Sequence, residues 1–295
     1  MLVLKSNVAL SNTNLPILPL PEVPTADELL IAAASPSVWL DLGGGRLSVD
    51  GSGNFLTLTD RATADLYVPR DTIAPEVVAG ASRNFLRFGN ADHGATTTDS
   101  GRLVQSTPTD RLAASGIHTI ASVWYGASPA AAPWTSVWDG GTGFGGTILG
   151  SATGFFRSAF FRGVKDGDPL NGRAFVPWQN NSNFTTFGFW NAYLGQPVAT
   201  WNVSILSWSE TTGRVVWYDE TTTIADSTAY TVPTMDVTSG ALHPVICGYG
   251  TAGVAGDAMA GDIASLIYIP GMDIIGDTDL LAALRAHLGT IKAAL

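Results

Sequence analysis

The clearest pattern in the chain is an alternation of apolar and polar residues over residues 201–220, WNVSILSWSETTGRVVWYDE. The alternation stops at residues 209–213 and then resumes, which predicts a β-hairpin. Gly213 supplies the positive φ that a hairpin loop of three to five residues usually needs. The inward row predicted for this hairpin consists of Trp201, Val203, Ile205, Val215 and Trp217.

A second strand is predicted over residues 261–270, GDIASLIYIP, which carries apolar residues on both faces. The alternation assigns Ile263, Ile267 and Ile269 to one face, and Ala264, Leu266 and Tyr268 to the other. Such a strand is typical of the centre of a sheet that is covered on both sides. We expect a facing sheet on one side and the segment that follows the strand on the other.

That following segment, residues 277–295, predicts an amphipathic helix with Asp277 or Thr278 as its cap. Its apolar stripe consists of Leu281, Leu284, Leu288 and Ile291. The basic residues Arg285, His287 and Lys292 lie toward the C-terminal end, where the helix dipole favours cations.

The first 24 residues are predicted to form an extended arm. Their prolines, Pro16, Pro19, Pro21 and Pro24, exclude a helix. The segment LPILPLPEV is apolar, and an exposed apolar segment normally has a surface to dock on. We expect that surface to belong to another subunit, with packing on its own domain as the alternative. Residues 25–36 are predicted to form a short helix, with a Thr25–Glu28 capping box and an end at Pro36.

Between the two helices the pattern is one of strands and turns. Strands are predicted within residues 37–60, 84–88, 119–125, 146–150 and 155–161. No repeat of fixed period is present, which argues against propellers and solenoids. We therefore expect one all-β sandwich over residues 37–271 and a helix over residues 272–295 packed on it.

Composition narrows the function classes. The net charge of −10 argues against a nucleic-acid surface, because phosphate binding needs clustered Lys and Arg. Nine Trp raise the expectation of saccharide contact, since the indole ring can stack and its N–H can donate. The single cysteine, Cys247, lies in an apolar run and is expected to be a buried structural thiol.

Targeting signals are not visible in the sequence. The residues after Lys5 are too polar for the core of a signal peptide, and no apolar run approaches the ~20 residues of a membrane span. The protein is therefore expected to be made and folded in a cytoplasm.

The order of four segments resembles the laminin G-like, concanavalin A-like jelly-roll family. The early strand NFLRFGNADHG, the strand TIASVWY over residues 119–125, the hairpin over residues 201–218 and the closing stretch over residues 248–268 each look like that family's motifs. The resemblance covers about residues 37–295. It implies a jelly-roll sandwich of two antiparallel sheets, a fold that hosts many functions.

Together with the arm and the C-terminal helix, the chain resembles bacteriophage virion proteins of tail fibres, tail tips and capsid decorations. The resemblance implies a non-enzymatic component of the virion, made in the host cytoplasm, that docks on other virion proteins through residues 1–24. Further expected partners are copies of itself, for which a trimer would suit a fibre, and a host-surface saccharide; nucleic acid and membrane are not expected. The alternatives are a structural or decorating subunit with no ligand, and a carbohydrate-active enzyme.

Catalysis has little support in the sequence. Hydrolases of this fold use acidic residues spaced as Glu-x-Asp-x-x-Glu, because retaining chemistry needs two carboxyls about 5–5.5 Å apart. None of the five Glu has such a partner, and no Gly-x-Ser-x-Gly turn accompanies the four His. All four histidines are expected to be structural or solvated.

Two binding sites are predicted instead. Stacking rings and amide side chains, which suit sugar hydroxyls, cluster in residues 178–193 and more weakly in residues 134–139. The saccharide candidates are Trp178, Asn180, Asn181, Trp190, Asn191 and Tyr193, with Trp138 and Asp139 as the weaker set. The alternative is that these rings are core and the Asn residues form turns. The loop KDGDPLNG offers weak calcium candidates, Asp166, Asp168 and Asn171, and no other cofactor is expected.

Overall fold

The computed structural model describes residues 23–43, 45–70, 74–88, 101–113, 116–126, 144–151, 156–162, 173–179, 200–209, 211–227, 242–247 and 261–295. Within this part of the chain the elements are α1 (Ala26–Ala33), β1 (Val38–Asp41), β2 (Leu47–Val49), β3 (Phe55–Thr59), β4 (Leu66–Pro69), β5 (Glu76–Ala79), β6 (Asn84–Phe88), β7 (Leu103–Gln105), β8 (Ile117–Gly126), β9 (Phe144–Ser151), β10 (Phe156–Arg162), β11 (Arg173–Gln179), β12 (Trp201–Ser209), β13 (Arg214–Tyr218), β14 (Thr223–Ser227), β15 (Pro244–Ile246), β16 (Gly261–Pro270) and α2 (Thr278–Ala293). Of the predicted arm, residues 1–22 lie outside the described residues.

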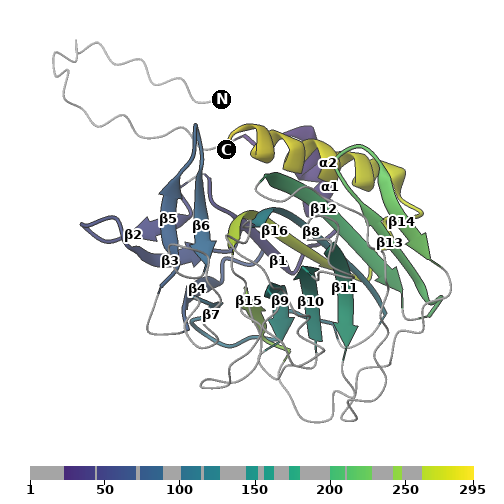
Figure 1. Cartoon of the computed structure of the whole chain (residues 1–295), viewed down its shortest axis with the longest axis horizontal. Helices are drawn as coiled ribbons and strands as arrows, with labels where there is room; N and C mark the ends of the chain where they lie inside the picture. Colours follow the sequence, from purple (N-terminus) through teal and green to yellow (C-terminus); the bar gives the residue numbers. More distant parts are fainter. Residues whose placement is uncertain are drawn as a thin grey trace, which may run out of the picture.

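The strands form two antiparallel sheets, which confirms the predicted all-β sandwich. One sheet has the order β14-β13-β12-β8-β16-β6-β5, with β1 also paired to β16. The other has the order β11-β10-β9-β15-β7-β4-β3-β2. Figure 1 shows the two sheets as layers, with α2 and α1 against the outer face of the first sheet. The molecule thus has a helix layer, a sheet covered on both faces and a second sheet.

The predicted hairpin is β12 and β13, but its inward row was assigned wrongly. Leu206 pairs with Trp217 and Trp208 with Val215, so Val215 and Trp217 share the even-numbered face of β12. Val203 and Ile205 lie on the opposite face, because neighbouring residues of a strand point to opposite sides. Ser209 pairs with Arg214 at the end of the loop, and this register places Val215 opposite Trp208. Both faces of β12 are buried, so the polarity of its side chains does not distinguish an inward face from an outward one.

The central position predicted for β16 is confirmed, since it pairs with β8, β6 and β1 and is buried over nearly its whole length. One face assignment was wrong. A β-bulge interrupts the pairing between Ile263 and Ser265, and it shifts the alternation by one residue. Ile263 therefore faces the second sheet, while Ile267 lies on the side of the helices.

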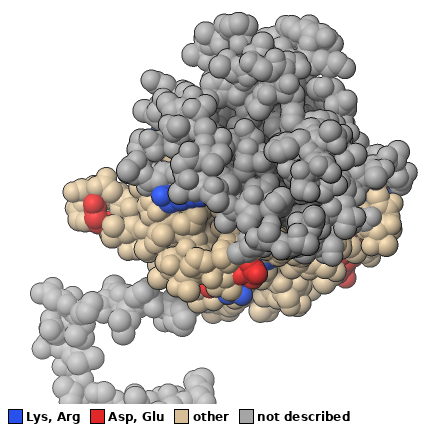
Figure 2. Space-filling view, turned by 90° about the horizontal axis from the view of Figure 1, so that it is seen from below, with Lys and Arg blue, Asp and Glu red and all other residues tan. Residues whose placement is uncertain are grey.

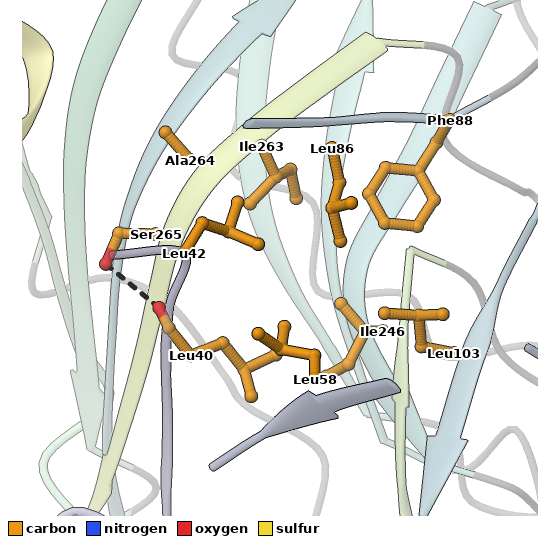
Figure 3. A pocket seen from close by; sticks show the side chains of 10 residues that line it. All are labelled: Leu40, Leu42, Leu58, Leu86, Phe88, Leu103, Ile246, Ile263, Ala264 and Ser265. Carbon is orange, nitrogen blue, oxygen red and sulfur yellow. Dashed lines mark hydrogen bonds between the residues drawn. The ribbon is translucent and has the colours of Figure 1, made fainter. Parts of the chain in front are cut away.

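The core between the sheets is apolar and closely packed. A small internal space of about 10 Å³ lies in this core. Figure 3 shows the side chains around it. The space is lined by Leu40, Leu42, Leu58, Leu86, Phe88, Leu103, Ile246, Ile263, Ala264 and Ser265. Leu58, from the second sheet, is 1 % exposed. Burial of these side chains is the main force that joins the two sheets.

The two helices pack on each other and on the first sheet. Thr25 and Glu28 form the predicted capping box at α1, and the carboxylate of Asp277 accepts the Leu280 N–H (2.9 Å) at the start of α2. α2 crosses β12, β8 and β16. Its buried stripe consists of Leu280, Ala283, Leu284, His287, Leu288 and Ile291. His287 is therefore a member of the buried face, which corrects the prediction of a cation at the helix end.

Cys247 is fully buried, as predicted for a structural thiol, and burial raises its pKa well above the usual range. No helix among the described residues is long and apolar enough to cross a membrane.

Candidate functional site

Trp178 is the one saccharide candidate within the described residues. It lies in β11, where its backbone is paired with Arg157 of β10, at one end of the strand order of the second sheet. The other saccharide candidates, Asn180, Asn181, Trp190, Asn191, Tyr193, Trp138 and Asp139, lie outside the described residues. The calcium candidates Asp166, Asp168 and Asn171 also lie outside them.

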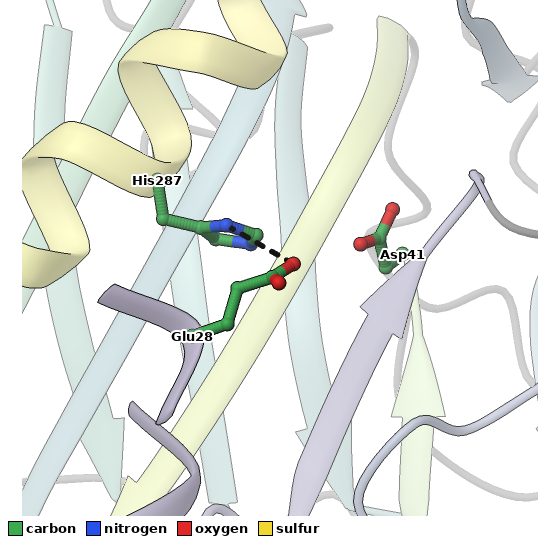
Figure 4. Close-up of side chains that lie close together, drawn as sticks. All are labelled: Glu28, Asp41 and His287. Atoms are coloured by element: carbon green, nitrogen blue, oxygen red, sulfur yellow. Dashed lines mark ion pairs between the residues drawn. The ribbon is translucent and has the colours of Figure 1, made fainter. Parts of the chain in front are cut away.

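The structure instead brings together ionisable residues that are far apart in the sequence. We call Glu28, Asp41, Arg61, Arg83 and His287 the helix-side cluster. Glu28 comes from α1, Asp41 from β1 and His287 from α2, and the Glu28 carboxylate lies between the other two side chains (Figure 4). Asp41 points to the helix side because Leu40, its neighbour in the strand, fills the core between the sheets.

Ion pairs link the members of the cluster. The Arg61 guanidinium binds Glu28 directly and lies 3.4 Å from an Asp41 oxygen, while Arg83 binds Asp41. His287 Nδ1 is 3.8 Å from the Glu28 carboxylate. A second oxygen of Glu28 accepts the Thr25 N–H (2.8 Å), so that the capping box and the ion pair share one side chain.

The environment shifts two pKa values in the cluster. The hydrogen bond from Arg61 lowers the pKa of Glu28 to about 2. Burial lowers the pKa of His287 to about 4, against the attraction of Glu28. Glu28 is therefore ionised and His287 neutral at neutral pH. The imidazole also packs edge-on against Trp39, with ring centroids 5.7 Å apart.

Glu28, Asp41 and His287 offer ligand atoms within 4.8 Å of one another, which is close enough for a metal ion. The two arginines argue against this use, because they already neutralise both carboxylates and would repel a cation. The carboxylates of Glu28 and Asp41 do not suit the active site of a glycosidase either. A general acid needs a raised pKa, and that of Glu28 is lowered. The cluster is therefore a structural joint between α1, β1 and α2.

Other carboxylates of the described residues are engaged in the same way. Asp65 binds Arg111 (2.8 Å), and Asp262 binds Arg87 (3.1 Å). Asp60, which is 1 % exposed, accepts backbone N–H groups, including that of Trp39 (3.1 Å). Burial raises the pKa of Asp60, against the lowering effect of the backbone N–H groups that it accepts. Asp65 and Asp262 are held in ion pairs that join neighbouring strands and loops.

A polar and aromatic row runs between the sheets on β8, β12 and β16. His118 stacks on Trp208 with ring centroids 4.7 Å apart, and its Nδ1 lies 2.8 Å from the Tyr268 hydroxyl. That hydroxyl accepts the Ala113 N–H (3.1 Å), so its own proton is available to His118. A hydroxyl orients this imidazole where a catalytic base would have a carboxylate. The sequence prediction of a structural His118 agrees with this arrangement.

The N-terminal end of the described chain exposes apolar side chains. Val23 is 87 % exposed, and Leu29 and Leu30 of α1 are 59 % and 47 % exposed. Beside them lies a groove of about 210 Å³, which we call the α1 groove. It is lined by Pro24, Glu28, Leu29, Ala32, Ser35, Pro36, Trp39, Arg61 and Ala62. The Arg61 guanidinium covers the Trp39 ring at 4.4 Å. Arg61 and Glu28 belong both to the lining of the groove and to the helix-side cluster.

Sequence reasoning missed the helix-side cluster and the α1 groove. One signal was available, since His287 falls three residues after Leu284 and four before Ile291, a spacing that puts it in the apolar stripe. On the face drawn in Figure 2, the visible Lys, Arg, Asp and Glu of the described residues are few and scattered.

No family model matches the chain, and no curated protein matches it. Among solved structures, a Trypanosoma rangeli sialidase mutant with trans-sialidase activity is similar with a TM-score of 0.47 and 11 % identity, over 88 % of this chain and 34 % of that chain. Domain 4 of AbnA, a GH43 extracellular arabinanase from Geobacillus stearothermophilus in complex with arabinotriose, has a TM-score of 0.47 and 13 % identity, over 83 % and 98 %. The botulinum neurotoxin serotype G binding domain has a TM-score of 0.39 and 10 % identity, over 85 % and 51 %.

The chain thus spans about a third of the length of the sialidase it matches. Nothing about activity or ligand follows for this chain from likenesses of this size.

Proposed function

We propose that this chain is a bacteriophage virion component that attaches through its N-terminal arm, residues 1–24, and displays a lectin-like sandwich without catalysis of its own. The observation that carries the proposal is the exposed apolar surface where the arm meets the domain, formed by Val23, Leu29 and Leu30. Large apolar side chains gathered on a surface mark an interaction site. The arm continues the same chemistry in the sequence LPILPLPEV.

The segment proposed for attachment is separate from the domain proposed for display. The buried core begins at Ile31 and includes residues of both sheets and of α2. A chain without residues 1–23 therefore retains every core side chain found among the described residues. This arrangement suits a domain that is presented on a particle by a segment which its own stability does not need.

The proposal of a domain without catalysis draws its support from the described carboxylates. Among them Glu28, Asp41, Asp65 and Asp262 are bound by arginines, which does not suit a general acid or a nucleophile. These residues therefore favour a binding or structural role over a carbohydrate-active enzyme.

The displayed ligand is proposed to be a host-surface saccharide, with the decorating subunit without a ligand as the second candidate. One observation favours the second. Of the tryptophans whose side chains are described, Trp39, Trp124, Trp208 and Trp217 are buried in the core, so the high Trp content serves packing at these positions. Saccharide binding then depends on Trp178, Trp190 and Trp138.

We expect full-length protein to bind at least one saccharide on a glycan array, and Trp178→Ala or Trp190→Ala to weaken that binding about fivefold or more. The reason is the loss of a stacked ring, which contributes ~1 kcal/mol. Titration of the best saccharide by calorimetry measures the change. Leu66→Ala, at an exposed position of β4, is the matched control and should bind as the wild type does. A folded protein that binds no saccharide would favour the decorating subunit.

A further inference from the structure

We propose that the α1 groove receives the proline-rich arm of a second copy of this chain, so that copies assemble by exchanging arms. The occupant is the segment of residues 15–21, LPILPLP. This inference rests on the proposed function, in which the arm attaches the protein, and it adds the receiving surface.

The chemistry of the groove suits an uncharged, apolar segment. Leu29, Ala32 and Pro36 contribute apolar walls. The Trp39 ring, which is 2 % exposed, lies beneath the Arg61 guanidinium at the floor of the groove. The charged groups that reach the groove, Glu28 and Arg61, are bound to each other. A charged ligand would have to break that pair, whereas an apolar one leaves it intact.

The arm has matching chemistry. No charged residue lies between Lys5 and Glu22, and Pro16 and Pro19 stand three residues apart. A polyproline II helix has three residues per turn, which places these two prolines on one side of the segment. Segments with this spacing dock in grooves lined by aromatic residues. Residues 15–21 would extend over about 20 Å in this conformation.

The direction of the chain favours a partner's arm over the chain's own. Pro24 lines the groove and Val23 is 87 % exposed, so the chain leaves the surface at the rim. Residues 15–21 could return to the same groove only by a sharp reversal within residues 22–24. Pro24 restrains Val23 to an extended conformation, which opposes that reversal. In extended form, residues 1–22 reach up to ~70 Å, far enough for a neighbouring domain.

Two full-length variants test the exchange. Ala32→Arg fills the groove with a large cation on an exposed helix position, and Leu18→Asp/Leu20→Asp makes the arm polar. Each should weaken self-association at least tenfold, as measured by light scattering across a concentration series. The matched control is Ala33→Arg, which is exposed on the same helix but does not line the groove, and it should associate as the wild type does.

Mixing the two variants gives the decisive result. The Ala32→Arg chain still has an intact arm and the Leu18→Asp/Leu20→Asp chain still has an intact groove, so the mixture should form a complex that neither forms alone. Circular dichroism confirms that each is folded. A wild-type mass for Ala32→Arg, a mixture that contains only monomers, or a monomeric wild type would overturn the exchange. If deletion of the arm abolishes assembly while Ala32→Arg does not, the arm attaches at another surface, and the proposed function survives without the groove.

Discussion

Acidification from above pH 6.5 to about pH 4 is expected to lower the free energy of unfolding by about 3 kcal/mol more in the wild-type chain than in a His287→Gln variant. His287 is 8 % exposed and lies on the face of α2 that packs on the sheet. The groups that face it are Trp39, Glu28, Arg61, Arg83 and Asp27.

The sign follows from the direction of the pKa shift. Burial lowers the pKa of His287 from 6.5 in the unfolded chain to about 4 in the folded protein. Between these values the unfolded chain binds a proton that the folded protein does not, so protons favour unfolding. The contribution of His287 is complete above pH 6.5 and is lost as the pH falls to about 4. Glutamine does not titrate, and the variant lacks this dependence.

Denaturant unfolding of both proteins at a series of pH values measures the effect. The difference between the two curves isolates His287, because the other titrating groups are common to both chains. Parallel curves between pH 6.5 and 4 would show that the imidazole is accessible to water in the folded protein, and that α1, β1 and α2 do not pack tightly around it.

Leu58→Ala is expected to cost about 2–5 kcal/mol of stability. Leu58 is 1 % exposed and faces Leu40, Leu103 and Ile246 in the core between the sheets (Figure 3). Its truncation removes buried methyl groups and enlarges a space that already exists there, so little relaxation can compensate. Equilibrium unfolding in urea measures the cost.

The matched control for this change is Leu56→Ala, two residues earlier in β3, where the side chain is 46 % exposed. It should change the stability by no more than about 0.5 kcal/mol. Equal losses for Leu56→Ala and Leu58→Ala would mean that the packing between the sheets is not what holds the sandwich together.

The sequence predicted the positions of the strands better than it predicted the side of the sheet to which each residue points. Alternation located β12, β13 and β16, because a strand's period of two is visible over a few residues. The face assignments failed at Ile263 and at Val215, where a bulge and a loop each shifted the alternation by one residue. Such shifts depend on pairing between distant strands, and the local pattern does not contain them.

The helix-side cluster could not be predicted for a related reason. Asp41 and His287 are 246 residues apart in the sequence and meet only because β1 pairs with β16 and α2 packs across it. Glu28 was recognised as part of a capping box, which is a local signal, while its ion pair with Arg61 is not local. The saccharide candidates were chosen by composition alone, and apart from Trp178 they lie outside the described residues.

The central claim is that the arm is an assembly device attached to a self-sufficient sandwich. The most direct test is the mass of the full-length chain by light scattering, beside that of the same chain without residues 1–23. If the arm mediates assembly, the full-length chain forms a defined oligomer and the truncated chain a folded monomer. The same number of subunits in both proteins would contradict this.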